Sequence, residues 1–126
     1  MEQHYDFVRY CPVCEGPCTG SYTFKFTLNK DSYVFDIDSH SIDAIFEMQM
    51  EKHTGEYHDL PKTVREWNEM TGWRDEDSGT YLDIDEFIKC LDSNESDLNR
   101  KDFVAILIRF LRFAKSNNEE ITVELW

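Results

Sequence analysis

Two stretches near the start of the chain alternate apolar and polar residues. Residues 21–28 (SYTFKFTL) and 32–38 (SYVFDID) each place an aromatic or aliphatic side chain at nearly every second position. Because successive side chains of a strand point to opposite faces, this period predicts two half-buried strands. Asn29, Lys30 and Asp31 lie between them and predict the turn of a hairpin. Residues 1–20 show no clear period and contain two of the three prolines, so we expect an irregular arm there.

Two stretches with apolar residues at helical spacing follow the predicted hairpin. The first begins at Ser41, a residue type that caps helices, and is expected to end at Gly55. The second begins at Pro61, which suits the first turn of a helix, and is expected to end at Gly72. The side chains predicted to face inward from this second helix are Val64, Trp67 and Met70.

The second half of the chain predicts two more helices and a final strand. Asp83 and Glu86 form a capping-box pattern before one helix, although residues 80–84 (TYLDI) equally fit a short strand that runs into it. The most apolar helix begins near Lys101 and is expected to bury one stripe while Arg109 and Arg112 reach solvent. The residues of that stripe are Phe103, Ile106, Leu107, Phe110, Leu111 and Ala114. Residues 121–126 (ITVELW) then predict a strand, and strands separated by helices favour an α/β fold with a parallel sheet.

Charge is the strongest signal in the composition. The 126 residues, enough for one domain with a hydrophobic core, carry a formal net charge of −13. Such a surface repels nucleic acid and anionic membranes and attracts a basic protein. No apolar run approaches the roughly 20 residues that span a bilayer, and the first residues lack a basic segment followed by an apolar one. We therefore expect a cytoplasmic protein with a basic protein partner and with no direct membrane or nucleic-acid contact.

Two motifs resemble metal-binding sites. Cys11, Cys14 and Cys18 begin like a zinc site, because a C-x2-C turn can direct two thiolates at one ion, but no fourth ligand lies nearby and free thiols are the alternative. Residues 75–86 resemble a calcium loop, with Asp75, Asp77, Asp83 and Glu86 at positions 1, 3, 9 and 12. That loop has Thr80 at position 6, where glycine is needed for the sharp turn. We expect no cofactor other than this candidate zinc ion.

Enzymatic chemistry finds little support in the sequence. The four histidines lack metal-protease spacing, and the chain contains neither a glycine-rich phosphate loop nor a nucleophile elbow. Asp36 and Asp38 alternate outward from a predicted strand, but paired carboxylates without a pocket are weak evidence. We therefore expect a binding protein rather than an enzyme.

Three segments, in order, are similar to those of the barstar family of intracellular ribonuclease inhibitors. Residues 66–73 (EWNEMTGW) resemble the family's second helix, and residues 111–125 (LRFAKSNNEEITVEL) its last helix and last strand. Between them, residues 80–87 (TYLDIDEF) look like the family's short middle strand leading into a helix. The resemblance implies a barstar-like domain at residues 32–126, after an N-terminal arm at residues 1–31 that carries an extra strand.

The resemblance also implies a specific fold and function. The fold would be a three-stranded parallel sheet of residues 32–38, 80–84 and 121–126 packed against helices. The function would be to bind a ribonuclease and occlude its active site with the second helix and the loop before it. Such an immunity protein would neutralise a basic toxin, because carboxylates on a rigid helix can replace the phosphates of the substrate in a cationic cleft.

The match is incomplete at the positions where the family carries its acidic residues. Asn68 stands where the family has its principal helix aspartate, Val64 replaces another acidic residue, and Phe113 and Asn117 replace two more in the last helix. We therefore expect a target other than barnase. The candidate partner-binding residues are Glu56, Tyr57, Asp59, Trp67, Asn68, Glu69, Thr71, Trp73, Asp75, Glu76 and Asp77. The alternatives are an acidic DNA-mimic that antagonises a nucleic-acid-binding protein, and a calcium- or zinc-binding interaction module.

Overall fold

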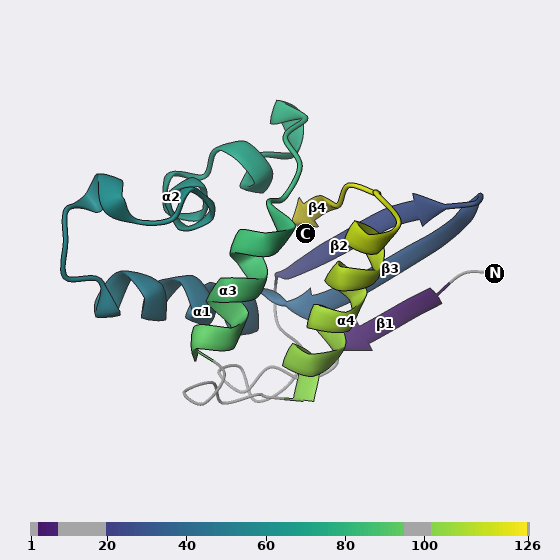
Figure 1. The fold of residues 1–126 in the computed structure, drawn as a ribbon, viewed down its shortest axis with the longest axis horizontal. Helices are drawn as coiled ribbons and strands as arrows, with labels where there is room; N and C mark the ends of the chain where they lie inside the picture. The colour runs from purple at the N-terminus through teal and green to yellow at the C-terminus, as the bar shows by residue number, and fades with distance from the viewer. Residues whose placement is uncertain (1–2, 8–19, 95–101, 126) are drawn as a thin grey trace.

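The computed structural model of the chain describes residues 3–7, 20–94 and 102–125, which combine a four-stranded sheet with four α-helices (Figure 1). The strands are β1 (Gln3–Phe7), β2 (Ser21–Leu28), β3 (Asp31–Asp38) and β4 (Thr122–Leu125). The helices are α1 (Ser39–Lys52), α2 (Lys62–Glu69), α3 (Ile84–Asn94) and α4 (Asp102–Ser116). Three short 3-10 turns lie between α1 and α3, namely η1 (Tyr57–Asp59), η2 (Gly72–Arg74) and η3 (Glu76–Ser78).

The predicted hairpin is confirmed. Strands β2 and β3 pair antiparallel from Ser21↔Asp38 to Leu28↔Asp31. The two turn residues, Asn29 and Lys30, have φ angles of 52° and 72°. Two left-handed residues in a two-residue turn match the right-handed twist of the flanking strands, which explains why this turn closes a tight hairpin.

The predicted three-stranded parallel sheet is wrong. The strand order is β1-β3-β2-β4, with β1 parallel to β3 and β2 antiparallel to both β3 and β4. The hairpin is the cause: β2 has to lie beside β3, and β4 then pairs with the free edge of β2 rather than with β3. Strands β3 and β4 therefore run in the same direction but are separated by β2.

Residues 80–84 do not form the strand that the resemblance implied. The N–H of Leu82 donates to the carbonyl of Ile121 over 3.2 Å, next to the start of β4. The chain then turns directly into α3, because the Asp83 carboxylate accepts a hydrogen bond from the Glu86 N–H (3.1 Å) and caps the helix. Helix capping therefore ends the extended segment after this backbone hydrogen bond next to the sheet.

The N-terminal segment also differs from the expected irregular arm. Residues 3–7 form strand β1, which pairs with β3 in register from Gln3↔Tyr33 to Phe7↔Ile37. Tyr5 and Phe7 alternate with polar residues, so a short strand pattern was present in the sequence. Because β2 lies inside the sheet, residues on both sides of the boundary expected at position 31 contribute to one sheet.

Aromatic residues from the sheet and the helices form the centre of the core. Phe24 of β2 lies 5.6 Å from Phe87 of α3, and Phe87 lies 5.6 Å from Phe46 of α1, measured between ring centroids. All three rings are fully buried. Figure 1 shows α4 crossing the sheet with α3 beside it, whereas α1 continues directly from the end of β3 and α2 lies on the far side of α1. The core thus connects the sheet to α2 through α1 and α3.

Helix α4 follows the predicted pattern closely. Phe103, Leu107, Phe110, Leu111 and Ala114 are buried, Ile106 is half-buried, and Arg109 and Arg112 are exposed. Among the described residues, neither this helix nor any other is both long and apolar enough to cross a membrane.

Candidate functional site

The predicted binding residues lie on or next to four consecutive elements at one end of the molecule. Turn η1, helix α2 and turns η2 and η3 follow one another along the chain and lie on the side of α1 and α3 away from β1 (Figure 1). Residues 56–77 contain seven acidic and three basic residues. Of the three basic residues, Lys62 is exposed, whereas Arg65 and Arg74 are half-buried. His58 is exposed as well. We use the name acidic surface for nine other exposed side chains of this segment, which are Glu56, Tyr57, Asp59, Asn68, Glu69, Met70, Thr71, Asp75 and Asp77.

Helix α2 is attached to the core through Trp67. This half-buried ring stacks on Phe46, with centroids 5.5 Å apart and an interplanar angle of 20°. Its Nε1–H donates to Asp43 Oδ1 over 2.7 Å, and the Tyr22 hydroxyl donates to the same oxygen over 2.5 Å. Burial, together with the hydrogen bond to Asp43, raises the pKa of Tyr22 above its ordinary range, so the hydroxyl stays a donor. One carboxylate on α1 therefore joins β2 to α2.

The start of α2 is capped by a residue from another helix. Glu86 of α3 accepts a hydrogen bond from the backbone N–H of Thr63 over 2.5 Å. The first N–H groups of a helix have no partner within the helix, and a carboxylate there also opposes the positive end of the helix dipole. This contact, between residues 23 positions apart, orients α2 relative to α3.

The end of α2 explains why Met70 is not buried as predicted. Met70 takes the left-handed conformation, with φ of 58°, and its side chain is 65% exposed. Gly72 is also left-handed, with φ of 56°, and a Cβ there would lie 1.1 Å from the Glu66 carboxylate. That carboxylate accepts a hydrogen bond from the Trp73 N–H over 3.2 Å. A glycine at position 72 therefore lets Glu66 hold the turn that leads Trp73 back into the core.

Three polar side chains from η1 and α2 meet on the acidic surface. The Tyr57 hydroxyl donates to Glu69 Oε2 over 2.7 Å and accepts from Asn68 Nδ2 over 3.1 Å. Tyr57 remains 43% exposed, and Asn68 and Glu69 are exposed. A carboxylate has about four acceptor positions, so Glu69 and the Asn68 carbonyl can still accept hydrogen bonds from a cationic donor. We call these three residues the tyrosine cluster.

The acidic residues in the turns stabilise the backbone and remain exposed. In η1, Glu56 and Asp59 form a capping box, in which the Glu56 N–H donates to Asp59 Oδ2 over 3.3 Å. In η3, Asp75 Oδ1 accepts from the Asp77 N–H over 3.0 Å. These hydrogen bonds fix the positions of carboxylates that face solvent, whereas the side chain of Glu76 lies outside the described residues.

The structure divides the predicted binding residues into surface and core. It brings Tyr57, Asn68 and Glu69 together and leaves Thr71 exposed. Trp73 is 2% exposed, and its Nε1–H donates to the Thr63 carbonyl over 2.9 Å, so its ring packs in the core. Trp67 is half-buried beneath the Arg74 guanidinium, whose carbon lies 5.4 Å from the ring centroid.

Two residues that shape this site are not among the predicted binding residues. Met70 adds an exposed apolar side chain, and its position depends on where the helix ends, the least certain feature of a helical pattern. Asp43 accepts a hydrogen bond from the Trp67 indole, but in the sequence it is one of several polar residues of helix α1 and nothing marks it out.

The carboxylates of the calcium-loop pattern have separate structural partners. Asp75 binds the N–H of Asp77, Asp83 binds that of Glu86, and Glu86 binds that of Thr63. Across the described residues, no group of three or more His, Cys, Asp or Glu side chains is placed to hold a metal ion. The candidate zinc ligands Cys11, Cys14 and Cys18 lie outside the described residues.

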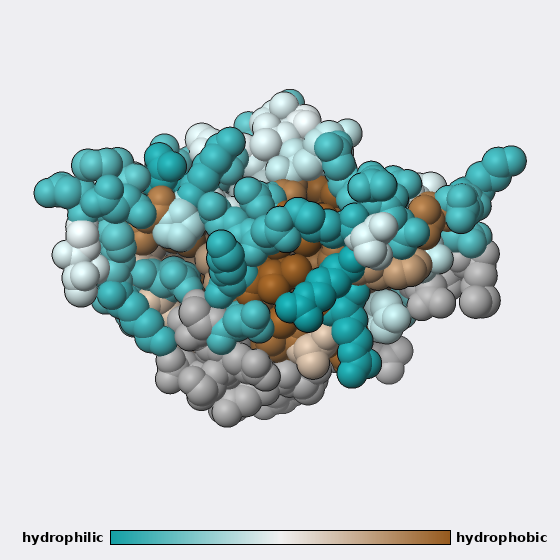
Figure 2. All heavy atoms as spheres, in the orientation of Figure 1, coloured by the Kyte–Doolittle hydropathy of each residue, from teal (hydrophilic) through white to brown (hydrophobic). Residues whose placement is uncertain are grey.

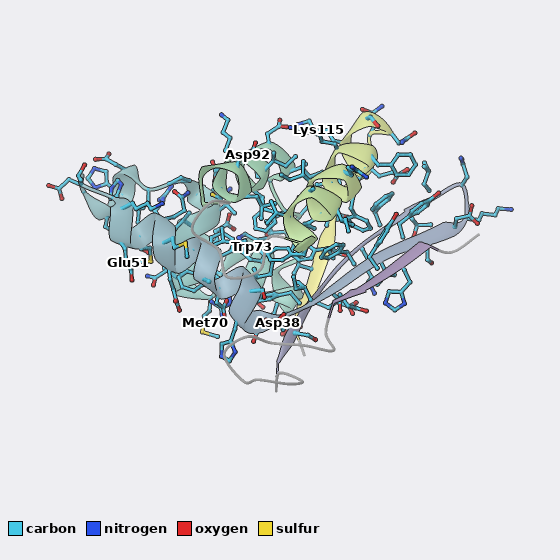
Figure 3. All side chains as sticks on the ribbon, turned by 90° about the horizontal axis from the view of Figure 1, so that it is seen from below. Asp38, Glu51, Met70, Trp73, Asp92 and Lys115 are labelled. Atoms are coloured by element: carbon cyan, nitrogen blue, oxygen red, sulfur yellow. The ribbon has the colours of Figure 1, made fainter. Side chains whose placement is uncertain are left out.

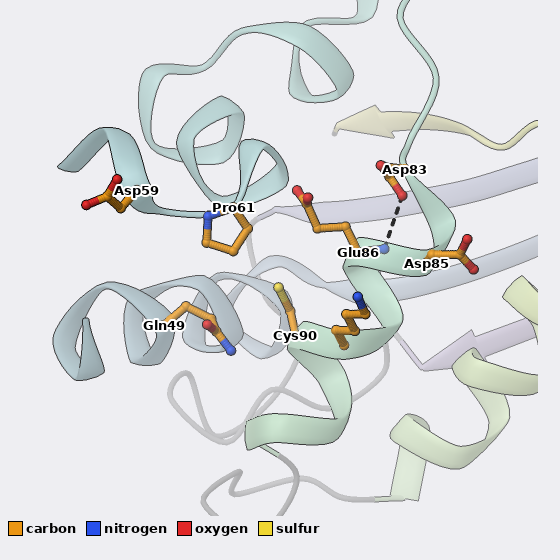
Figure 4. A pocket seen from close by; sticks show the side chains of 8 residues that line it. Gln49, Asp59, Pro61, Asp83, Asp85, Glu86 and Cys90 are labelled. Atoms are coloured by element: carbon orange, nitrogen blue, oxygen red, sulfur yellow. Dashed lines mark hydrogen bonds between the residues drawn. The ribbon is translucent and has the colours of Figure 1, made fainter. Parts of the chain in front are cut away.

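A pocket of about 540 Å³ lies beside the acidic surface (Figure 4). Its lining residues come from α1, from the segment around η1 and from the start of α3, and are Gln49, Asp59, Pro61, Asp83, Asp85, Glu86, Lys89 and Cys90. Four carboxylates and one ammonium give it an acidic lining. Burial, and to a lesser degree the nearby Glu86, raises the pKa of the Cys90 thiol to about 12. Because the thiolate is the nucleophilic form, Cys90 is not suited to covalent catalysis.

Cys90 is expected to react at least about a hundredfold more slowly with iodoacetamide in the folded protein than in urea, at mildly alkaline pH. It is 2% exposed, and its raised pKa keeps it protonated. Peptide mapping by mass spectrometry measures its labelling separately from that of the other three cysteines. Equal rates in the two states would show that the thiol is accessible.

The raised pKa of Cys90 also makes the free energy of unfolding depend on pH. The stabilisation from burying the neutral thiol is fully present below its ordinary pKa of 9.0 and is lost as the pH rises toward 12.

Comparisons with protein-family models, curated proteins and solved structures found no match to this chain. The resemblance to the barstar family therefore rests on the segments at 66–73, 80–87 and 111–125. Because the sheet differs from the one that the resemblance implied, the surface chemistry is the firmer basis for inferring function.

Proposed function

We propose that this protein is an acidic inhibitor that binds a basic ribonuclease or a related toxin and occludes its active site through the acidic surface. The net charge of −13 would attract a basic protein and speed its association. Within residues 56–77, two of the three cationic side chains turn toward the protein itself. Arg65 donates to the Leu60 carbonyl and Arg74 to the Trp67 carbonyl. Of the lysine and arginine side chains in this segment, Lys62 alone is exposed, whereas the exposed carboxylates are those of Glu56, Asp59, Glu69, Asp75 and Asp77.

The observation that carries this proposal is the tyrosine cluster. Tyr57, Asn68 and Glu69 are exposed yet hydrogen-bonded to one another, so their side chains are already ordered before a partner binds. Ordering a flexible side chain at an interface costs about 0.5–1.5 kcal/mol, and preorganisation avoids part of that cost. An ordered carboxylate beside an aromatic ring suits a guanidinium or ammonium group of a partner. Such a cation can form an ion pair with the carboxylate and lie over the face of the ring.

Two exposed apolar side chains complete the proposed interface. Tyr57 and Met70 are 43% and 65% exposed, and both residue types are enriched in protein interfaces. Such anchors at the centre of an interface usually supply most of the binding energy, and a polar rim supplies specificity. Glu56, Asp59, Asp75 and Asp77 would form that acidic rim.

The nuclease class of the target comes from the resemblance of α2 to the second helix of the barstar family. Asn68 occupies the position of the family's principal aspartate, and Glu69, the next residue, supplies a carboxylate to the cluster instead. A carboxylate displaced by one helical residue would meet a differently arranged cationic cleft. We therefore propose a target that differs from barnase in the positions of its basic residues.

The proposal predicts that binding losses are confined to the acidic surface. The immobilised protein should capture a basic nuclease from its source cells, and a nuclease assay should show inhibition of the captured enzyme. Tyr57→Ala and Glu69→Lys are each expected to weaken binding by at least about tenfold. Asp92→Lys, an equal charge reversal on the exposed face of α3, should change it by less than about threefold.

Two outcomes would contradict the proposal. If charge reversals at Glu69 and Asp92 each weakened binding by the same small factor, the result would favour a DNA-mimic, in which negative charge is spread over the whole surface. Capture of no basic protein, or capture without inhibition of a nuclease, would remove the inhibitor function itself.

A further inference from the structure

Helix α2 is attached to the rest of the protein by a small apolar area. Of its eight residues, Thr63 and Val64 are buried and Trp67 is half-buried, whereas the others are exposed or half-buried polar side chains. Hydrophilic side chains cover most of the molecular face seen in Figure 2, on which η1 and α2 lie at the left. Because apolar stabilisation scales with the area buried, α2 is held less firmly than α4, whose apolar stripe packs against the core.

The segment that contains α2 is anchored at both ends. Leu60, before the helix, is 5% exposed, and Trp73, after it, is 2% exposed. Figure 3 shows Trp73 in the interior and Met70 at the edge of the molecule. We call residues 61–72, which lie between the two anchors, the strap. Because both anchors lie outside the helix, α2 can open as a local unit while the two ends stay in the core.

Two carboxylates on other helices supply hydrogen bonds that hold the strap. Asp43 of α1 accepts from Trp67 Nε1–H over 2.7 Å, and Glu86 of α3 accepts from the Thr63 N–H over 2.5 Å. Hydrogen bonds to an ionised acceptor are roughly twice as strong as those between neutral groups. Proton uptake by Asp43 and Glu86 would therefore weaken the attachment of α2 at two points one helical turn apart.

The groups that face Asp43 come from β2, α2 and η2. The Tyr22 hydroxyl and the Trp67 indole donate to it, and the Arg74 guanidinium lies over that indole and donates to the Trp67 carbonyl. On α1 itself, His40 lies one turn before Asp43. A histidine that gains positive charge as the pH falls favours an ionised carboxylate nearby. Release of α2 is therefore expected where carboxyl groups, rather than histidine, take up protons.

The groups that face Glu86 come from α2 and from the pocket in Figure 4. Thr63 approaches from α2 through its N–H. The titratable groups that line the pocket with Glu86 are Asp59, Asp83, Asp85, Lys89 and Cys90. Burial keeps the Cys90 thiol neutral, so the carboxyl groups are the ones here whose charge changes on acidification.

We propose that the strap is an acid-sensitive switch, in which protonation of Asp43 and Glu86 releases α2 from α1 and α3 while the sheet and α4 stay folded. Ionised carboxylates hold α2 at neutral pH, so this attachment is present at high pH and is lost as the pH falls. Tyr57 lies before the first anchor, whereas Asn68 and Glu69 lie on the strap. Opening would therefore take apart the tyrosine cluster and switch off the acidic surface.

The test is an NMR titration of the ¹⁵N-labelled full chain from about pH 7 to about pH 3. The Trp67 Nε1–H signal, identified by its absence from Trp67→Phe, reports the bond to Asp43, and the Thr63 amide reports the bond to Glu86. Both signals should move toward the positions of groups without a hydrogen bond. Protection of the α2 amides against hydrogen exchange, corrected for the intrinsic rate at each pH, should fall at least about tenfold, and that of α4 by less than about twofold.

Two neutral variants imitate the protonated acids at pH 7. Asp43→Asn and Glu86→Gln should each lower the protection of the α2 amides by at least about threefold, and the double variant by at least about tenfold, with α4 unchanged. Glu47→Gln, at an exposed carboxylate of α1, is the matched control and should leave α2 unchanged.

Three results would overturn the switch. The first is loss of protection in α2 and α4 together as the pH falls, which is global unfolding. The second is a Trp67 Nε1–H signal that stays unchanged down to about pH 3, and the third is wild-type protection of α2 in both neutral variants. Because these measurements involve no partner, they stand whether or not the capture experiment finds a nuclease.

Discussion

Replacing Trp73 with alanine is expected to lower the free energy of unfolding by about 3–5 kcal/mol, the usual cost of deleting a large buried aromatic side chain. Trp73 is 2% exposed, and its ring lies 5.5 Å from Phe46 and 6.3 Å from both Tyr22 and Phe87. The substitution would leave a cavity where β2, α1 and α3 meet and would remove the hydrogen bond to the Thr63 carbonyl. Since small domains are stable by only about 5–15 kcal/mol, this loss is a large share of the total.

Urea unfolding followed by far-UV circular dichroism measures the effect without relying on tryptophan fluorescence. Trp73→Phe, which keeps most of the ring volume, should lose only about 1–2 kcal/mol and remains measurable if the alanine variant does not fold. Met70→Ala, at a side chain that is 65% exposed, should change stability by less than about 0.5 kcal/mol. A loss for Trp73→Ala no larger than that for Met70→Ala would show that the ring lies outside the core.

Local features of this fold were predictable because local interactions determine them. The alternating residues and the Asn29–Lys30 turn specify the hairpin, and both turn residues adopt the left-handed conformation that a two-residue turn requires. The apolar stripe of α4 specifies which residues face the core, and Arg109 and Arg112 are exposed as expected. In both cases the residues that decide the structure lie within a few positions of one another.

The arrangement of the strands was not predictable in the same way. The pairing of β4 with β2 joins residues about a hundred positions apart, such as Lys25 and Thr122, and no periodic pattern encodes it. The resemblance supplied a strand at 80–84 that the structure replaces with the cap of α3. An alternating pattern and a capping box overlap in these residues, and the helix cap decides the outcome.

The candidate site shows the same division between local and distant information. Acidic residues in 56–77 are visible in the sequence, and so is the helical spacing of α2. The hydrogen bond from Tyr57 to Glu69 spans 12 positions and depends on how η1 folds back against α2. The hydrogen bonds that hold α2 in place span 24 and 23 positions of the sequence, because their acceptors, Asp43 and Glu86, lie on two other helices.

Replacing Asp43 with alanine is expected to lower the free energy of unfolding by about 2–4 kcal/mol. Its Oδ1 accepts hydrogen bonds from both the Tyr22 hydroxyl and Trp67 Nε1–H, and its loss leaves two partly buried donors without an acceptor. Glu47→Ala, at an exposed position one turn further along α1, is the matched control and should cost less than about 0.5 kcal/mol. Chemical denaturation of both variants measures the difference.

A double-mutant cycle between Asp43→Ala and Trp67→Phe shows whether this carboxylate also positions the acidic surface. Trp67→Phe removes the indole donor but keeps a ring to stack on Phe46, so the second substitution should cost less once the first is present. A coupling energy of about 1 kcal/mol or more is expected for groups in direct contact. Additive losses would show that the two side chains act independently. Since Trp67 lies directly before Asn68 and Glu69, strong coupling would mean that a carboxylate of α1 sets the position of the tyrosine cluster that we propose for partner binding.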